Sequence, residues 1–151
     1  MSPSRFRLQT VLDVKQRLED VQQQELGALA QQRAIAEEAL RLLAQQAEEH
    51  QQALAARVAG GRIDMRDVRG ALDYIEAVRT SIATQRDRAT ELEARVRGSR
   101  ERLASIARER RMLELLRDRQ DAAALQEADR EDQRAADELV GQRYARRAWE
   151  V

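Results

Sequence analysis

The stretch that decides the fold is Val68-Arg-Gly-Ala-Leu-Asp-Tyr-Ile-Glu-Ala-Val-Arg-Thr-Ser-Ile82, which begins a hydrophobic repeat that continues to Ala124. Its steps of three and four residues average 3.5, so the apolar stripe stays on one side of a left-handed supercoiled helix. The a and d positions are Val68, Ala71, Ile75, Val78, Ile82, Gln85, Ala89, Leu92, Val96, Ser99, Leu103, Ile106, Arg110, Leu113, Arg117, Gln120 and Ala124. A repeat of roughly eight heptads indicates a coiled coil. We expect no pocket in such a chain, and a function in holding, spacing or transmitting.

Composition excludes several classes of protein. Charged residues make up 36% of the 151 residues and aromatic ones 3%, and 27 basic residues balance 27 acidic ones. This balance argues against nucleic acid as a partner, because nucleic-acid binders carry a basic excess. Cysteine is absent, which excludes disulfides and thiolate zinc sites. No apolar run is long enough to span a bilayer or to act as a signal peptide, so we expect a cytoplasmic protein.

An earlier segment also has helical spacing, and we predict a first helix over about 5–58. Pro3 precedes Ser4, a candidate N-cap. We expect the glutamine clusters, such as Gln22 to Gln24, to lie on solvated faces. The predicted apolar stripe contains Leu8, Val11, Leu18, Leu26, Leu29, Ala36, Leu40, Leu43, Ala47, Leu54 and Val58.

Gly60–Gly61 interrupts the helical pattern, and Asp64 follows as a candidate N-cap. We therefore predict an all-α fold: a two-helix antiparallel coiled-coil hairpin that forms a single domain over 1–151, with a turn at about 59–64 and a longer second helix at about 65–147. Opposed residue numbers should sum to about 125. This register sets Gly27 opposite Gly98. The pair marks either a layer in which the helices approach closely or pack loosely, or a coincidence.

The two arms are unequal. The N-terminal limit of the first helix is near Ser4, which lies opposite Asp121 in this register. The second helix continues past Asp121 to about Arg147. A polar helix without an apolar face depends on i,i+4 charge pairs of only ~0.2–0.5 kcal/mol each, so this overhang is either frayed or held by a partner. Tyr144 and Trp149 are candidate interface anchors there, with terminal disorder the alternative for Trp149.

Catalytic chemistry is not indicated. His50 is the only histidine and lies between Glu49 and Gln51, as a surface or seam residue would. The phosphate-loop, dinucleotide-binding and zinc-protease motifs are absent. We predict no enzyme activity, no cofactor, and no catalytic, cofactor-binding or metal-binding residues.

The order of features resembles the FliJ family, the coiled-coil stalk proteins of the flagellar type III export apparatus. The resemblance covers Phe6-Arg-Leu8, Ala36-Glu-Glu-Ala-Leu40 and Tyr74-Ile-Glu-Ala-Val78. Its most specific parts are Asp118-Arg-Gln-Asp-Ala-Ala-Ala-Leu125 and Asp132-Gln-Arg-Ala-Ala-Asp-Glu-Leu139. Heptad packing does not by itself demand these polar identities.

The resemblance implies a non-enzymatic stalk that is a monomeric hairpin, peripheral at the cytoplasmic face of the inner membrane. Its terminal end would enter the ring of the flagellar export ATPase, through Phe6, Leu8, Asp129, Arg130, Asp132, Arg134, Asp137, Glu138 and Arg143. Its turn end would bind the export gate protein FlhA and the export chaperones, through Ala39, Leu43, Gln46, His50, Tyr74, Val78, Ser81 and Gln85. Gln46 and His50 depart from the aromatic residues expected at those positions.

Three alternatives stay open: a stalk of a virulence-type injectisome, a dimeric structural coiled coil, and a secretion chaperone that binds substrate tails.

Overall fold

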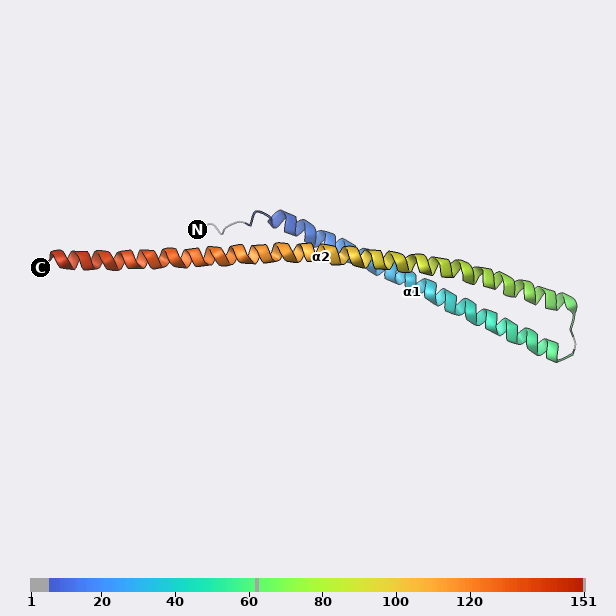
Figure 1. Cartoon of the computed structure of the whole chain (residues 1–151). Coiled ribbons are helices and arrows are strands. Elements are labelled where there is room, and N and C mark those ends of the chain that lie inside the picture. Colours follow the sequence, from blue (N-terminus) through green and yellow to red (C-terminus); the bar gives the residue numbers. More distant parts are fainter. Residues whose placement is uncertain (1–5, 62, 151) are drawn as a thin grey trace. The chain divides into compact units, whose positions relative to one another are not determined.

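The computed structural model describes residues 6–61 and 63–150. These form two helices, α1 (Gln9–Ala59) and the longer α2 (Met65–Trp149), which pack against each other as an antiparallel hairpin (Figure 1). The predicted fold class is confirmed. The hairpin divides into two units that each contain part of both helices. The turn unit comprises residues 20–104, and the terminal unit combines the stretch up to Glu19 with the stretch from Ser105 onward.

The turn between the helices has the chemistry that its sequence predicts. Gly61 has a φ of 74°, a left-handed conformation that glycine adopts without steric cost. The Gly60 backbone N–H donates to the carbonyl oxygen of Ala56 at 3.1 Å, which satisfies a carbonyl of the last turn of α1. Asp64 caps α2, because its side chain accepts a hydrogen bond from the Arg66 N–H at 3.0 Å.

The core of the turn unit follows the predicted seam of α2. Ile75, Val78, Leu92 and Val96 are all buried, and Ala36 is buried on α1. Opposing stripes of this kind hold the helices together, because each helix buries an apolar face that would otherwise contact water.

Two polar contacts across the seam establish the register in the turn unit. The Gln22 side-chain amide donates to the Ser99 hydroxyl at 2.7 Å, and Arg102 forms an ion pair with Glu25 at 3.8 Å. The numbers of these pairs sum to 121 and 127, close to the predicted 125.

One expectation about this unit was wrong, and one of the alternatives for the glycine pair is excluded. Gln22 is buried instead of solvated, because Ser99 on α2 supplies a partner for its amide. Gly27 and Gly98 do not mark a close approach of the helices, since a Cβ atom built on either one meets nothing within 4 Å.

In the terminal unit, the predicted seam of α1 is also wrong. Leu8, Val11 and Leu18 are exposed, whereas Leu12 is fully buried and Lys15 is half-buried. The seam therefore runs one residue later than the most hydrophobic stripe. The reason is that α2 presents charged residues in this unit, and these pair with charged residues of α1.

The ends of the paired region differ slightly from the prediction. α1 begins at Gln9 and not near residue 5, because residues 6–8 form a turn in which the Gln9 N–H donates to the Phe6 carbonyl at 3.1 Å. The proposed Ser4 cap lies outside the described residues. On α2, Gln120 is the last half-buried seam position and Ala124 is exposed, because α1 offers no residue opposite it.

Candidate partner-binding surfaces

The eight residues predicted at the gate and chaperone contact form two four-residue series with the same spacing, one on each helix. Ala39, Leu43, Gln46 and His50 lie on α1, and Tyr74, Val78, Ser81 and Gln85 lie on α2. Residues spaced by four, three and four share one face of a helix. We call these eight residues the turn-end strip.

The structure brings the two series together. The rings of His50 and Tyr74 are in contact, with centroids 4.2 Å apart and planes inclined by 48°. Ala39 and Gln85, at the other end of the strip, line the same depression of about 210 Å³. Both pairs sum to 124, as do the two pairs between them, so the strip is a ladder of four opposed pairs.

The members of the strip differ in exposure. Val78 is buried, and Ala39, Leu43 and Gln85 are half-buried, so these four also pack in the hairpin. Gln46, His50, Tyr74 and Ser81 are exposed and are the members most available to a partner. The free surface of the strip is thus an aromatic pair with two small polar side chains beside it.

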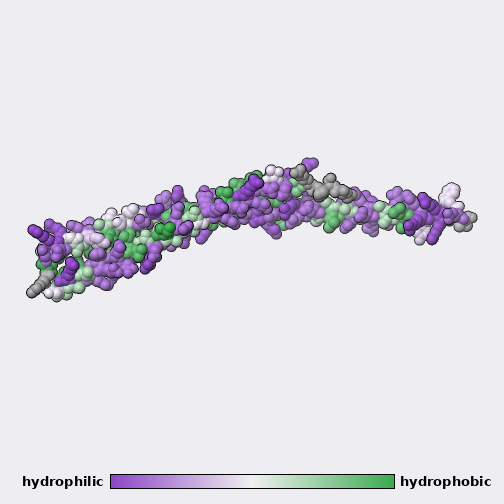
Figure 2. Space-filling model, turned by 180° about the vertical axis from the view of Figure 1, so that it is seen from behind, coloured by the Kyte–Doolittle hydropathy of each residue, from purple (hydrophilic) through white to green (hydrophobic). Residues whose placement is uncertain are grey.

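A groove of about 1070 Å³ lies on the opposite side of the seam, where the two helices diverge toward the turn (Figure 1). Leu54 and Val58 of α1 and Leu72 and Ile75 of α2 line it, and hydrophobic surface is visible at this end in Figure 2. The expectation of no pocket was therefore wrong. Leu72 directly flanks the heptad seam of α2, and Val58 is the last residue of the predicted apolar stripe of α1, and these two residues were the sequence signal for the groove.

At the other end, α2 continues as a helix beyond the paired region, and we call residues 121–149 the overhang. Seven predicted ATPase-contact residues lie on it, and all are exposed: Asp129, Arg130, Asp132, Arg134, Asp137, Glu138 and Arg143. Arg130 pairs with Glu127 at 3.6 Å within the helix. Tyr144 and Trp149 have exposed fractions of 70% and 90%. These side chains therefore have no core of their own to join.

The remaining two predicted ATPase contacts, Phe6 and Leu8, lie just before α1. Phe6 is half-buried and Leu8 is exposed. The structure thus places all nine predicted residues of this end in the terminal unit. Phe6 and Leu8 adjoin the paired helices, whereas the charged residues project along the overhang.

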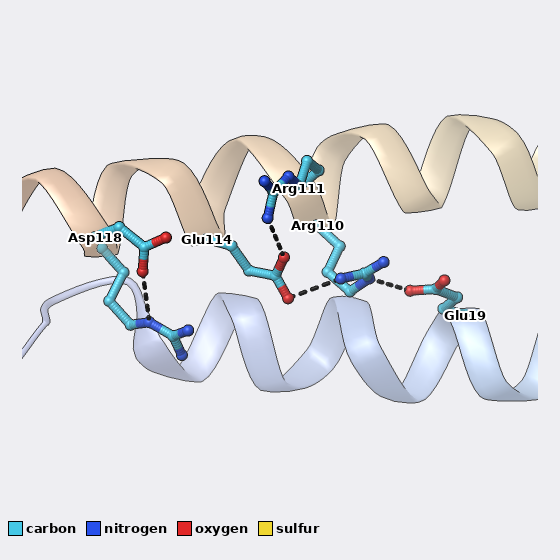
Figure 3. Close-up of polar contacts among 6 residues, drawn as sticks. Glu19, Arg110, Arg111, Glu114 and Asp118 are labelled. Atoms are coloured by element: carbon cyan, nitrogen blue, oxygen red, sulfur yellow. Dashed lines mark hydrogen bonds and ion pairs between the residues drawn. The ribbon is translucent and has the colours of Figure 1, made fainter.

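The paired part of the terminal unit contains a charged seam, made by Lys15 and Glu19 of α1 with Glu109, Arg110 and Glu114 of α2. Lys15 pairs with Glu109, and Arg110 pairs with Glu19 across the helices. Arg110 also donates to Glu114 at 2.7 Å (Figure 3). The heptad repeat predicts Arg110 at a seam position but not its carboxylate partners, because Glu19 lies outside the predicted apolar stripe of α1.

These contacts shift two pKa values. Hydrogen bonds to Glu19 and Glu114 raise the pKa of the Arg110 guanidinium. The hydrogen bond from Arg110 lowers the pKa of the Glu114 carboxyl, more strongly than desolvation raises it. The side chains of Arg110 and Glu114 keep 27% and 17% of their surface exposed, so water screens the pair.

Among residues 6–61 and 63–150, there is no group of three or more side chains of the kinds that hold a metal ion. In the same part of the chain, neither helix has an apolar stretch that could cross a membrane.

Comparison with known proteins identifies a family. The family model described as "Flagellar FliJ protein" matches residues 4–148, nearly the whole chain. No match was found among curated proteins or solved structures. The matched region contains both helices, the turn-end strip and most of the overhang, and on this ground the chain belongs to the FliJ family, whose members are stalk-like components of flagellar protein export.

Proposed function

We propose that this protein is a non-enzymatic stalk of the flagellar export apparatus, which inserts its terminal end into the export ATPase ring. Its turn end links that ring to the export gate protein FlhA and to export chaperones. It works as a monomeric hairpin in the cytoplasm, at the inner face of the membrane. Membership of a flagellar family favours this reading over an injectisome stalk.

The observation that carries the proposal is the inequality of the two arms. α2 continues through residues 121–149, and within residues 6–61 and 63–150 no second helix lies beside this stretch, where Ala128 alone is half-buried. A continuous helix rises by about 1.5 Å per residue and carries a movement of one end along its axis to the other. Its side chains can be contacted from all sides. A ring that encloses the overhang would contact it on all sides and would receive a movement carried along its axis.

The turn-end strip supports the other half of the proposal. Its exposed His50–Tyr74 pair presents aromatic surface, and aromatic residues are enriched at the centres of protein interfaces. Because Tyr74 is 42% exposed while already held against His50, it can bury more surface on a partner with little loss of side-chain entropy.

Deletion of residues 129–151 tests the ATPase contact. The truncated hairpin should fold, since the described part of that segment contributes nothing to the buried core, and it should lose both binding to the export ATPase and stimulation of ATP hydrolysis. Undiminished stimulation by the truncated protein would refute ring insertion.

The matched control is the double substitution Leu43→Ala and Tyr74→Ala at the turn end. It should leave ATPase stimulation intact and weaken binding to the cytoplasmic part of FlhA or to the chaperones. If both variants weakened the same contact, the assignment of separate ends to separate partners would be wrong.

The monomeric state is tested by cysteines at positions 29 and 96, which lie opposite each other in the predicted register. Oxidation should crosslink them within one chain. A product of twice the monomer mass would instead favour the dimeric coiled coil.

A further inference from the structure

The first turns of α1 leave an apolar surface uncovered. Val11, Val14 and Leu18 repeat at steps of three and four and have exposed fractions of 43%, 47% and 44%. Hydrophobic surface is visible along the first part of α1 in Figure 2. This stripe is more hydrophobic than the seam beside it, where α1 places Leu12, Lys15 and Glu19.

α2 contributes its own uncovered residues to the terminal unit. Met112, Leu115 and Leu116 have exposed fractions of 66%, 43% and 47%. Met112 and Leu116 each directly precede a seam residue, as the three exposed residues of α1 do. We call the six residues the apolar flank: Val11, Val14, Leu18, Met112, Leu115 and Leu116.

The two halves of the flank lie on the same side of the hairpin. In an antiparallel pair, the residue directly before a seam position lies on the same side of the pair in both helices. The second helix runs in the opposite direction but also faces the first, and these two reversals cancel. Glu109, one heptad before Leu116, pairs with the seam residue Lys15, so this flank of α2 adjoins α1. The five side chains that precede seam positions therefore line one side of the two helices, and Leu115 adjoins them because it lies three residues after Met112 on the same helix face.

Four exposed arginines surround this surface. Arg17 lies three residues after Val14 and shares its face of α1, and Arg7 lies four residues before Val11, in the turn of residues 6–8 that precedes this helix. Arg108 and Arg119 have the same relation to Met112 and Leu116 on α2. We call these four the arginine rim: Arg7, Arg17, Arg108 and Arg119.

The rim is not paired with carboxylates in the described part of the chain. Among the described residues, none of its four guanidinium groups takes part in an ion pair or a side-chain hydrogen bond, in contrast to Arg110 and Arg111 of the same turn of α2. Glu109, the carboxylate on this flank, is engaged by Lys15. The flank is thus apolar at its centre and positively charged around it.

We propose that the apolar flank binds an amphipathic helix of a partner protein whose apolar stripe is bordered by Asp and Glu. Steps of three and four on both helices of the hairpin match the side-chain rows of a third helix. Carboxylates suit the rim, because guanidinium groups bind them in a bidentate manner. A second copy of this chain fits poorly, since a symmetric contact would oppose rim to rim.

This inference goes beyond the proposed function and does not rest on it. The proposed contacts with the ATPase use Phe6, Leu8 and the overhang, and none of the residues of the flank or its rim. Deletion of residues 129–151 leaves the flank intact, so the two proposals fail separately.

The test uses the full-length protein and two labelled helical peptides with Leu and Ile at heptad positions a and d. One peptide carries Glu at positions e and g, and the other carries Lys there. Fluorescence anisotropy should show that the Glu peptide binds at least about tenfold more tightly, and that its affinity falls with added salt.

Two variants assign this binding to the flank. Reversal of the rim (R7E, R17E, R108E and R119E together) should make the protein prefer the Lys peptide. Val14→Ser with Met112→Ser and Leu116→Ser should weaken binding of the Glu peptide about tenfold or more. The matched control reverses four exposed arginines near the turn (R57E, R66E, R69E and R79E) and should change neither preference. Circular dichroism checks that each variant keeps its helices.

The remaining outcomes overturn the proposal. Equal binding of both peptides, or an unchanged preference after reversal of the rim, would show that the flank does not distinguish acidic from basic partner helices. Tighter binding to anionic phospholipid vesicles than to the Glu peptide, through the same arginines, would assign the surface to a membrane. A concentration-dependent dimer in sedimentation that the serine variant abolishes would assign it to a second copy.

Discussion

The turn unit and the terminal unit use the same heptad geometry with opposite chemistry in the seam. In the turn unit the buried seam positions are mostly aliphatic, with Ile75, Val78, Leu92 and Val96 on α2. In the terminal unit the seam includes the half-buried residues Lys15, Glu19 and Arg110, which form ion pairs between the helices. Aliphatic burial supplies most of the stability of such a pair, whereas charged contacts contribute less and restrict which residues can face each other.

This comparison teaches that stability and register have separate origins along one hairpin. The turn unit should be the more stable part of the molecule, and the charged seam should set the alignment of the terminal unit. Four substitutions or conditions test the distinction, with expected effects that decrease from Leu92→Ala to Gly27→Ala.

The largest effect is expected from Leu92→Ala in the turn unit. Leu92 is 5% exposed, and truncation of a buried leucine costs about 2–4 kcal/mol of unfolding free energy, through lost burial and the cavity that remains. Leu103→Ala, at a half-buried position of the same seam, should cost less. Urea unfolding of both variants measures the two losses of unfolding free energy. Equal losses would show that the contribution of a seam residue to stability does not depend on its burial.

Ser99→Ala should have the second largest effect. It removes the partner of the buried Gln22 amide, and an unsatisfied buried polar group costs about 1–3 kcal/mol. The double variant Gln22→Leu with Ser99→Ala removes both polar groups and should recover most of that loss. A double-mutant cycle by thermal unfolding tests this. Additive losses would mean that the hydrogen bond does not couple the two helices.

The seam of α2 could be predicted from the sequence up to Gln120, because one stripe dominates that helix. The seam of α1 could not be predicted near its start, since Val11, Val14 and Leu18 form a more hydrophobic stripe than Leu12, Lys15 and Glu19. Partners on α2, above all Arg110, select the second stripe, and a single helix pattern does not contain that information. The spacing of the turn-end strip was readable from the sequence, whereas the His50–Tyr74 contact and the groove depend on how the helices diverge.

Acid should loosen the terminal unit before the turn unit. The pKa of Glu114 is lowered in the fold, so its contribution to stability is present above the ordinary carboxyl pKa and is lost as the pH falls through the lowered value. The core residues of the turn unit, such as Leu92, do not titrate. Hydrogen exchange, corrected for its intrinsic pH dependence, should therefore show earlier loss of protection at residues 105–120 than at 75–99. Glu114→Gln should reduce the contrast, and simultaneous loss in both segments would refute it.

The smallest effect is expected from Gly27→Ala, and it should stabilise the hairpin. Gly27 lies inside α1, and a Cβ atom built there meets nothing within 4 Å, so alanine adds no steric clash. Replacing glycine by alanine in a helix interior contributes about 0.5–1 kcal/mol, largely by restricting the unfolded chain. Gly61→Ala is the matched control, because a Cβ atom there also meets nothing, yet the φ of 74° disfavours any side chain. The two variants should therefore move the thermal midpoint in opposite directions. Destabilisation by Gly27→Ala would mean that the helices approach each other there after all, and the polar layer formed by Gln22 and Ser99 would then adjoin a glycine contact that helps to set the register.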